Sequence, residues 1–229
     1  MLTGWKGPGV AILAVAVCFG AGFGTGHRLA REAPPPHPSP VCRPSAPQLA
    51  ADHAGLPIMP FIGNSLLFDH DWRIDGALAA ICARQGLLAR EAPALIASLP
   101  GMAPEMVVFG FGTVEVLRAG LADRQIDPAG FAQAAQDITR SPRARWPEVR
   151  LVWLRIPRTG SGPIRPPDVL ALNDALTGVL VAAHPGAILL DTGPLSSGGP
   201  VMPSYDGIHL TAPGYLAWER ALARLVAQR

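Results

Sequence analysis

The sequence predicts an α/β fold, a three-layer sandwich around a central, mainly parallel sheet of five strands. Short apolar runs alternate along the chain with longer segments of helical pattern, and this alternation is typical of a parallel sheet covered on both faces. Glycine or proline closes most of the apolar runs, as is usual where regular structure is interrupted. The part of the chain with this pattern has roughly 180 residues, enough for the core of one domain.

Five apolar runs are the predicted strands. The first ends at Gly63, the third runs into a glycine-rich segment, and Pro157 closes the fourth. Three helices are predicted from their periodicity and their first residues. Asp127 and Thr211 can each cap a helix, and a proline in the first turn follows both. The predicted strands are residues 58–62, 78–83, 106–109, 149–156 and 187–190, and the predicted helices are residues 127–139, 168–183 and 211–228.

Two segments precede the predicted domain. Residues 9–26 carry no charge, and a helix of that length reaches about 27 Å, close to the hydrocarbon thickness of a bilayer. A cleavable signal peptide has a similar layout, so residues 1–27 are either a membrane anchor, which we favour, or a signal peptide. Residues 28–55 form a proline-rich linker, which leaves residues 56–229 as the folded domain. We expect this domain to be tethered to a membrane and to face the periplasm or the cell exterior.

Charge and cysteine usage exclude some partners. Charged residues make up 16% of the chain, the net charge is +2, and the arginines are scattered singly. Phosphate binding needs clustered Lys and Arg, so we expect no nucleic acid to bind. The three cysteines are too few for a disulfide framework, and the sequence has no zinc-site spacing. We expect Cys42 and Cys82 to be free thiols; the alternative is a bridge between them in an exported domain.

Polar residues follow the strands at the edge where parallel sheets bind their ligands. Ser65 comes directly after the first strand, in Gly63-Asn64-Ser65. Ser65 is thus placed where a hydroxyl could attack a ligand bound at the sheet edge. Most serines that follow a strand and a glycine in this way are ordinary turn residues or helix caps. Near the end of the chain, Asp206 and His209 lie three residues apart in SYDGIHL. A histidine acts as a general base when a carboxylate holds its imidazole in one tautomer, so His209 is a candidate base and Asp206 its orienting acid.

Two further loops could bind the negative charge that develops on an attacked carbonyl. Gly86 follows the second strand and can present its backbone N–H to an oxyanion. The segment Gly110-Phe111-Gly112-Thr113 follows the third strand, and its glycines allow the backbone to approach a ligand closely. Each of these loops, taken alone, is also typical of an ordinary turn.

Together the four loops resemble the SGNH/GDSL hydrolase family, which has a flavodoxin-like α/β fold. The resemblance covers essentially the whole domain and is most specific at its end, in DGIHLTAPGYLAWERAL. It implies that Ser65 is a nucleophile, His209 its base and Asp206 the residue that orients this base. It also implies that the N–H groups of Ser65 and Gly86 bind the oxyanion. The implied reaction is cleavage of a small acyl ester through an acyl-enzyme, with no metal or organic cofactor.

The third loop departs from the family pattern. Where the family has Gly-x-Asn and then an acid, this chain has Gly112-Thr113-Val114-Glu115. Valine donates no hydrogen bond, and loss of one oxyanion donor typically lowers the rate by about 10²–10³-fold. The hydroxyl of Thr113 could substitute for the missing amide. Three outcomes stay open: an esterase, an acyltransferase to glycan hydroxyls, and a silent domain that binds an acylated glycan or a partner protein.

The remaining polar residues near these loops have simpler explanations. Asp69-His70-Asp71 suggests a metal site, but adjacent side chains point apart and we expect a solvated loop. Asp191 ends the fifth strand and is the second choice to orient His209. An extracytoplasmic domain would meet O-acylated glycans or lipids of the cell envelope, which are therefore the expected substrates. The oligomeric state stays open.

Overall fold

The computed structural model describes residues 42–44, 55–99, 103–159, 162–191 and 203–228. The predicted membrane segment, residues 9–26, lies outside these ranges, so its assignment stays a prediction. In the ranges that the structure describes, no helix is both long enough and apolar enough to cross a membrane. The chain divides into two units, residues 1–38 and 39–229, and every described residue belongs to the second unit.

Six strands form one sheet in the order β1-β3-β2-β4-β5-β6. Strands β2 to β6 are parallel and correspond to the five predicted strands, so the predicted fold class is confirmed. The short strand β1 falls within the predicted linker and pairs antiparallel with β3 at the edge of the sheet. The bounds are β1 Arg43–Pro44, β2 Ile58–Gly63, β3 Leu78–Ile81, β4 Met106–Gly110, β5 Arg150–Leu154 and β6 Ile188–Leu190.

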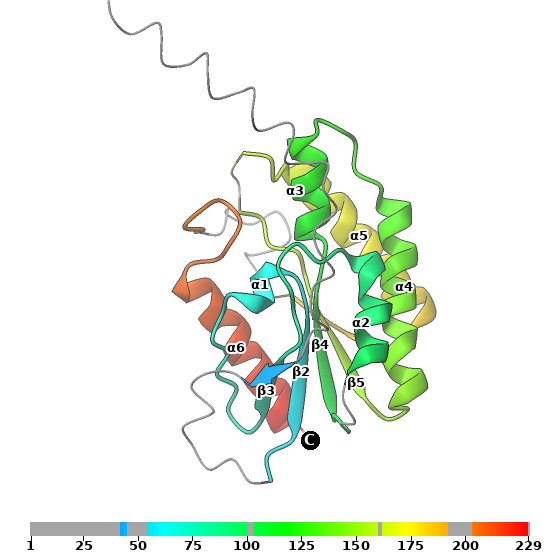
Figure 1. Ribbon diagram of the computed structural model, residues 1–229, viewed down its shortest axis with the longest axis vertical. Helices are drawn as coiled ribbons and strands as arrows, with labels where there is room; N and C mark the ends of the chain where they lie inside the picture. The colour runs from blue at the N-terminus through cyan, green and yellow to red at the C-terminus, as the bar shows by residue number, and fades with distance from the viewer. Residues whose placement is uncertain (1–41, 45–54, 100–102, 160–161, 192–202, 229) are drawn as a thin grey trace, which may run out of the picture. The chain divides into compact units, whose positions relative to one another are not determined.

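Helices cover both faces of the sheet, with α6 and α1 on one side and α2 to α5 on the other (Figure 1). The three helices predicted from the sequence are α4, α5 and α6. The shorter helices α1, α2 and α3 were not predicted. The bounds are α1 Ser65–Phe68, α2 Ala92–Ser98, α3 Thr113–Leu121, α4 Pro128–Arg145, α5 Pro166–Ala183 and α6 Ala212–Ala227, with a 3₁₀ turn, η2, at Ala89–Glu91.

Each face of the sheet has its own apolar core. Successive side chains of a strand point to opposite faces. Along β4, Met106 and Val108 pack with α6, whereas Val107 and Phe109 pack with the helices of the other face. Because both faces are buried, the central strands are apolar throughout, and this is why they stand out in the sequence.

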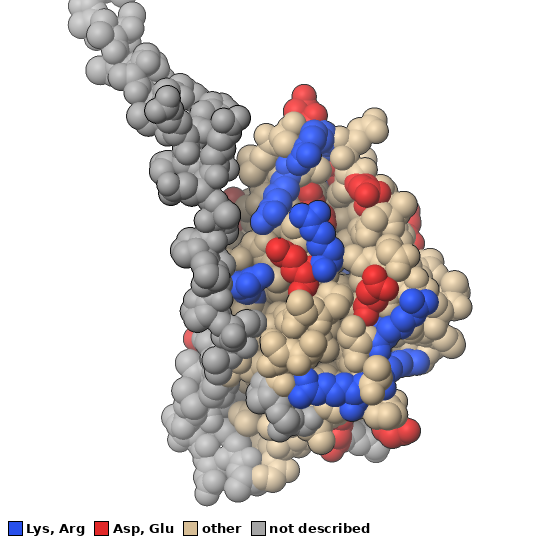
Figure 2. Space-filling model, turned by 45° about the vertical axis from the view of Figure 1, so that its right-hand side comes forward, with Lys and Arg blue, Asp and Glu red and all other residues tan. Residues whose placement is uncertain are grey.

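Basic and acidic side chains are interspersed on the surface that Figure 2 shows. On the described part of that face they form no broad area of one sign. This distribution agrees with the small net charge of +2. That no nucleic acid binds stays a prediction.

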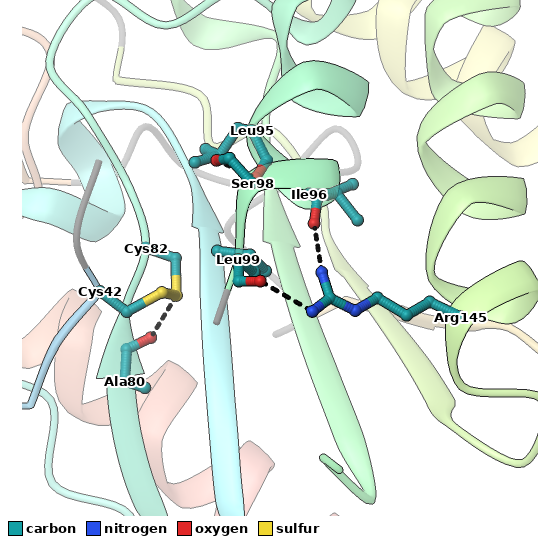
Figure 3. The surroundings of a disulfide bond; sticks show 8 residues. All are labelled: Cys42, Ala80, Cys82, Leu95, Ile96, Ser98, Leu99 and Arg145. Atoms are coloured by element: carbon teal, nitrogen blue, oxygen red, sulfur yellow. Dashed lines mark hydrogen bonds between the residues drawn. A yellow bond between two sulfur atoms is a disulfide. The ribbon is translucent and has the colours of Figure 1, made fainter. Parts of the chain in front are cut away.

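A disulfide joins Cys42 to Cys82 and ties β1 to the residue that follows β3 (Figure 3). The expectation of free thiols is therefore wrong. The two cysteines are 40 residues apart in the sequence, so their spacing does not indicate a bond. The antiparallel pairing of Arg43 with Ile81 brings them together, and their Cα atoms lie 4.2 Å apart.

Strands β2 and β4 approach each other closely where they end. Gly63 pairs with Gly110, and a Cβ atom on Gly63 would lie 2.3 Å from the carbonyl oxygen of Gly110. A Cβ atom on Gly110 would lie 2.9 Å from the side chain of Leu67 in α1. Both distances are too short for carbon, so this crossing requires glycine on both strands.

The substitution Gly63→Ala is expected to lower the free energy of unfolding by about 3 kcal/mol, because the added methyl group overpacks the neighbouring strand. Gly178→Ala in α5 is the matched control, since a Cβ atom there meets nothing within 4 Å. Alanine in a helix is favoured over glycine by about 0.5–1 kcal/mol, so the control should be slightly more stable than the wild type. Urea unfolding followed by circular dichroism measures both. Wild-type stability of Gly63→Ala would contradict the close crossing.

Candidate active site

Backbone hydrogen bonds align the loops that follow β2, β3 and β4. The N–H of Asn64 donates to the carbonyl of Gly110 at 3.2 Å, and the N–H of Arg84 donates to the carbonyl of Gly63 at 2.9 Å. Three adjacent parallel strands therefore end together, at the edge where α/β sheets bind ligands. The predicted nucleophile and both predicted oxyanion loops follow these strands.

Ser65 is the first residue of α1, and Asn64 caps this helix. The Oδ1 atom of Asn64 accepts a hydrogen bond from the N–H of Leu66 at 3.1 Å, which is the usual contact of an N-cap. Asn64 is fully buried. Ser65 is partly exposed, so a substrate can reach its hydroxyl, as nucleophilic attack requires.

Asp206 holds both the backbone and the side chain of His209. Its Oδ1 atom accepts the N–H groups of Ile208 at 2.9 Å and of His209 at 2.7 Å, and its Oδ2 atom lies 2.5 Å from Nδ1 of His209. Although desolvation acts in the opposite direction, these hydrogen bonds lower the pKa of Asp206. The ionised carboxylate fixes the imidazole with Nδ1–H toward it. Asp191, the second choice for this function, pairs with Arg155 at 3.4 Å.

The loop that carries His209 is held at several points. Ser204 and Leu210 form an isolated antiparallel bridge that closes the loop. The hydroxyl of Thr159, which follows β5 in the sequence, donates to the carbonyl of Gly207 at 2.6 Å. The histidine therefore has a defined position even though it precedes α6 and lies on a loop.

The second imidazole nitrogen, Nε2 of His209, faces the end of α1. It lies 3.4 Å from Oδ2 of Asp69, the residue that caps the C-terminus of this helix. The N–H of Asp69 donates to the carbonyl of Ser65 at 2.9 Å, so the two residues are one helical turn apart on the same side of α1. Nε2 is buried and makes no hydrogen bond within the described ranges, to Ser65 or to any other residue. The structure thus brings His209 to the helical turn that begins with Ser65.

Residues 69–71 do not converge on a metal site. His70 stacks on Tyr215 of α6 with the ring centroids 4.1 Å apart, and its Nε2 lies 3.1 Å from Oε1 of Glu219. The buried carboxylate of Glu219 also accepts the N–H of Arg73 at 2.7 Å. Over the part of the chain that the structure describes, no three metal-ligating side chains gather. This segment instead fastens the loop after α1 to α6.

Glu115 joins the two predicted oxyanion loops, a function that the sequence analysis did not assign to it. Its Oε2 atom accepts the N–H of Gly112 at 3.0 Å, and its Oε1 atom accepts the N–H of Ala89 at 2.7 Å. Burial raises the pKa of Glu115. Gly86 and Gly112 have φ angles of +68° and +103°, a region that favours glycine. An acid three residues after Gly112 is the sequence signal of such a cap.

Thr113 and Val114 begin α3 directly after this loop. Val114 is 5% exposed, so its apolar side chain is buried; that this position corresponds to the asparagine of the SGNH/GDSL family stays a prediction. The hydroxyl of Thr113 is also buried, and it makes no hydrogen bond to any residue that the structure describes. Thr113 is therefore the one of the two that can offer a donor.

Three cavities in the described part of the chain lie apart from Ser65, Asp206 and His209, although Glu115 lines one of them. One of 630 Å³ is lined by residues near the start of β4 and β5, at the opposite edge of the sheet from the candidate site. A second, of 370 Å³, lies between η2, α3 and α4, and a third, of 280 Å³, lies beside α5 and β6. None of the three is lined by Ser65, Asp206 or His209.

The fold is an α/β sandwich, and at this edge of its sheet Asp206 contacts His209, which in turn lies beside the helical turn that begins with Ser65. No family model and no curated protein matches the sequence. Among solved structures, the chain is similar to an alpha/beta hydrolase enzyme from the metagenome of Lake Arreo in Spain, with a TM-score of 0.58 at 16% identity over 75% of this chain and 95% of that chain.

Two esterases are similar to a comparable extent. A carbohydrate esterase family 3 protein from Talaromyces cellulolyticus has a TM-score of 0.56 at 16% identity, over 75% of this chain and 96% of that chain. The acetylxylan esterase Axe2 from Geobacillus stearothermophilus has a TM-score of 0.54 at 14% identity, over 74% of this chain and 94% of that chain. At such identities the likeness establishes the shared fold.

His70 gives the folded chain a pH dependence whose sign can be worked out. Burial lowers the pKa of His70 below its usual value of 6.5, against the effect of Glu219. The unfolded chain therefore takes up this proton first as the pH falls, and the free energy of unfolding decreases below pH 6.5. His70→Gln keeps a donor for Glu219 but cannot be protonated. Between pH 8 and pH 5 the wild type should lose more stability in urea titrations than His70→Gln, and equal losses would contradict this assignment.

Proposed function

We propose that this chain is a serine ester hydrolase that cleaves small acyl esters through an acyl-enzyme. The observation that carries the proposal is the environment of His209. Asp206 binds Nδ1 at 2.5 Å, while Nε2 is buried beside the first helical turn of α1 without a hydrogen bond in the described ranges. A neutral imidazole in this tautomer has its basic nitrogen directed to the side of Ser65.

In the proposed reaction, Oγ of Ser65 attacks the ester carbonyl while its proton passes to Nε2 of His209. The tetrahedral intermediate then collapses, the ester C–O bond breaks, and the alcohol leaves with the proton from Nε2. Water attacks the acyl-enzyme with His209 again as base, which releases the acid and restores Ser65. Asp206 remains ionised and stabilises the imidazolium in both steps. Catalytic hydrogen bonds are often long before substrate binds, so Ser65 and Nε2 are expected to meet in the substrate complex.

The oxyanion is bound in this proposal by the N–H groups of Ser65 and Gly86. The buried hydroxyl of Thr113 is the third donor, in place of the asparagine amide of the SGNH/GDSL family. Val114 lies beside it and offers none. A site with a well-held base and a reduced set of oxyanion donors should turn over slowly.

Substrate class and location rest on two further observations. Enzymes with the same fold include an acetylxylan esterase, which supports an acetyl group or another small acyl group here. The Cys42–Cys82 disulfide supports an extracytoplasmic location, because disulfides persist in oxidising compartments. We therefore propose that residues 9–26 anchor or export the domain and that its substrates are O-acylated glycans or lipids of the envelope.

Ser65→Ala is expected to reduce hydrolysis of a chromogenic acetate ester to the background rate, a loss of roughly 10⁴-fold in a fully active enzyme and less in a slow one. Ser98→Ala is the matched control, because the Ser98 hydroxyl contacts only the carbonyl of Leu95 on α2 among the contacts described, at 2.8 Å. Steady-state release of the chromophore measures both. If the wild type were no faster than Ser65→Ala, the hydrolase proposal would be wrong.

Val114→Asn is expected to raise the rate by about tenfold or more, because it restores an oxyanion donor. Val114→Ala changes the volume without adding a donor and should give no gain. The same esterase assay compares the three proteins at substrate saturation. A Val114→Asn protein that folds normally and is no faster than Val114→Ala would rule out this position as the missing donor.

The buried apolar side chain of Val114 favours a second candidate function, a catalytically silent domain that binds an acylated glycan or a partner protein. The Ser65→Ala comparison distinguishes the two functions: a hydrolase cleaves the ester faster than Ser65→Ala does, whereas a silent domain does not. An acyltransferase shares the acyl-enzyme and differs in the acceptor. Adding free sugar to the assay separates the two enzymes, because a transferase moves the acyl group to the sugar while a hydrolase releases the free acid.

A further inference from the structure

Tyr205 presents an open aromatic surface next to His209. It is 67% exposed, and its ring lies within 17° of parallel to the imidazole of His209, with the centroids 5.7 Å apart. Its backbone N–H donates to the carbonyl of His209 at 3.2 Å, so the ring stands on a loop that is already fixed. An aromatic ring held in position and left open to solvent is suited to binding a flat apolar surface.

Asp69 and Gln85 form a polar pair around the same histidine. The Nε2 atom of Gln85 donates to Oδ1 of Asp69 at 3.1 Å, and Oδ2 of Asp69 lies 3.4 Å from Nε2 of His209. Side chains from three loops, those after α1, after β3 and before α6, thus lie around His209.

In the proposed reaction, the alcohol half of the ester lies next to these side chains. The inference below therefore rests on the proposed function. The leaving alcohol takes its proton from Nε2 of His209, so its oxygen must come within hydrogen-bonding distance of that nitrogen. Asp69 lies 3.4 Å from the same nitrogen. A hydroxyl on the ring carbon adjacent to the acylated carbon would then come within reach of the Asp69 carboxylate.

We propose that Tyr205, Asp69 and Gln85 form a subsite for the alcohol half of the ester, and that this alcohol is a neutral sugar ring with a hydroxyl next to the acylated position. Tyr205 packs against the C–H face of the ring. Asp69 accepts a hydrogen bond from the adjacent hydroxyl, and the amide of Gln85 orients Asp69. An O-acylated glycan is accordingly favoured over an acylated lipid as the substrate.

Two physical arguments favour a neutral sugar. A fatty alcohol would cover the polar groups of Asp69 and Gln85 without replacing their hydrogen bonds, which is costly. A sugar acid would bring its negative charge close to the carboxylates of Asp69 and Asp206, and like charges repel. A neutral ring with hydroxyls satisfies both the aromatic surface and the polar pair.

Three acetate esters test the subsite when acetate release is measured on the full chain. They are a methyl pyranoside with one O-acetyl group, cyclohexyl acetate, which has a ring without hydroxyls, and ethyl acetate, which has no ring. In the wild type, kcat/KM should be highest for the pyranoside, lower for cyclohexyl acetate and lowest for ethyl acetate. A preference for cyclohexyl acetate over the pyranoside would overturn the sugar assignment.

Two variants separate the contributions of stacking and hydrogen bonding. Tyr205→Ala should lower the ratio of kcat/KM for the pyranoside to that for ethyl acetate by roughly 3- to 10-fold, and Tyr205→Phe should keep this ratio. Gln85→Ala should lower the ratio for the pyranoside to that for cyclohexyl acetate by roughly 3- to 10-fold. Val181→Ala, an exposed apolar position on α5, is the control and should change neither ratio. Unchanged ratios in both site variants would overturn the subsite while leaving the hydrolase intact.

Failure of the proposed function gives a different result. In that case the wild type cleaves none of the esters faster than Ser65→Ala does. Binding of the pyranoside to Ser65→Ala, followed by NMR titration, then tests the subsite separately. Weaker binding after the further change Tyr205→Ala supports the subsite without catalysis, and unchanged binding overturns it.

Discussion

The candidate site depends on the close crossing of β2 and β4 at Gly63 and Gly110. A side chain on Gly63 would collide with the backbone of β4, and one on Gly110 would collide with Leu67 of α1. The contact of the two strands lets the N–H of Asn64 bond to the carbonyl of Gly110 at 3.2 Å, and this bond begins α1 beside the loop that leads into α3. Backbone packing therefore fixes the distance between Ser65, the proposed nucleophile, and the loop that leads into α3. The same crossing leaves room for the side chain of Leu67 in α1, which is fully buried against the two glycines.

The candidate site has more polar groups around His209 than around the loop that leads into α3. On the base side, one carboxylate, Asp206, makes three contacts with the loop of His209, and Asp69 adds a second negative charge near the imidazole. On the oxyanion side, an apolar Val114 is buried beside a threonine hydroxyl. For the proposed esterase, such a site suits activated or well-positioned esters, since positioning can offset a weak oxyanion hole.

The sequence predicts the central strands well because both their faces are buried, so that each strand is a continuous apolar run. It places the end of α4 too early: the predicted helix ends at residue 139, whereas the observed helix continues through Pro142 to Arg145. Tertiary packing outweighs the local cost of proline there, about 3 kcal/mol. Ser65, Asp206 and His209 could be proposed from motifs, which are local. The contact of Asp69 with His209 could not, because it joins residues 140 positions apart (69 to 209).

The disulfide between Cys42 and Cys82 changes how the domain bears mechanical load. A pull on the chain from before residue 42 passes through the sulfur atoms directly into the segment after β3. The residues between the two cysteines, Ser65 among them, form a closed covalent loop that carries none of the tension. If residues 9–26 tether the domain as proposed, movement of the attachment strains the segment after β3 and leaves Ser65 and α1 without load.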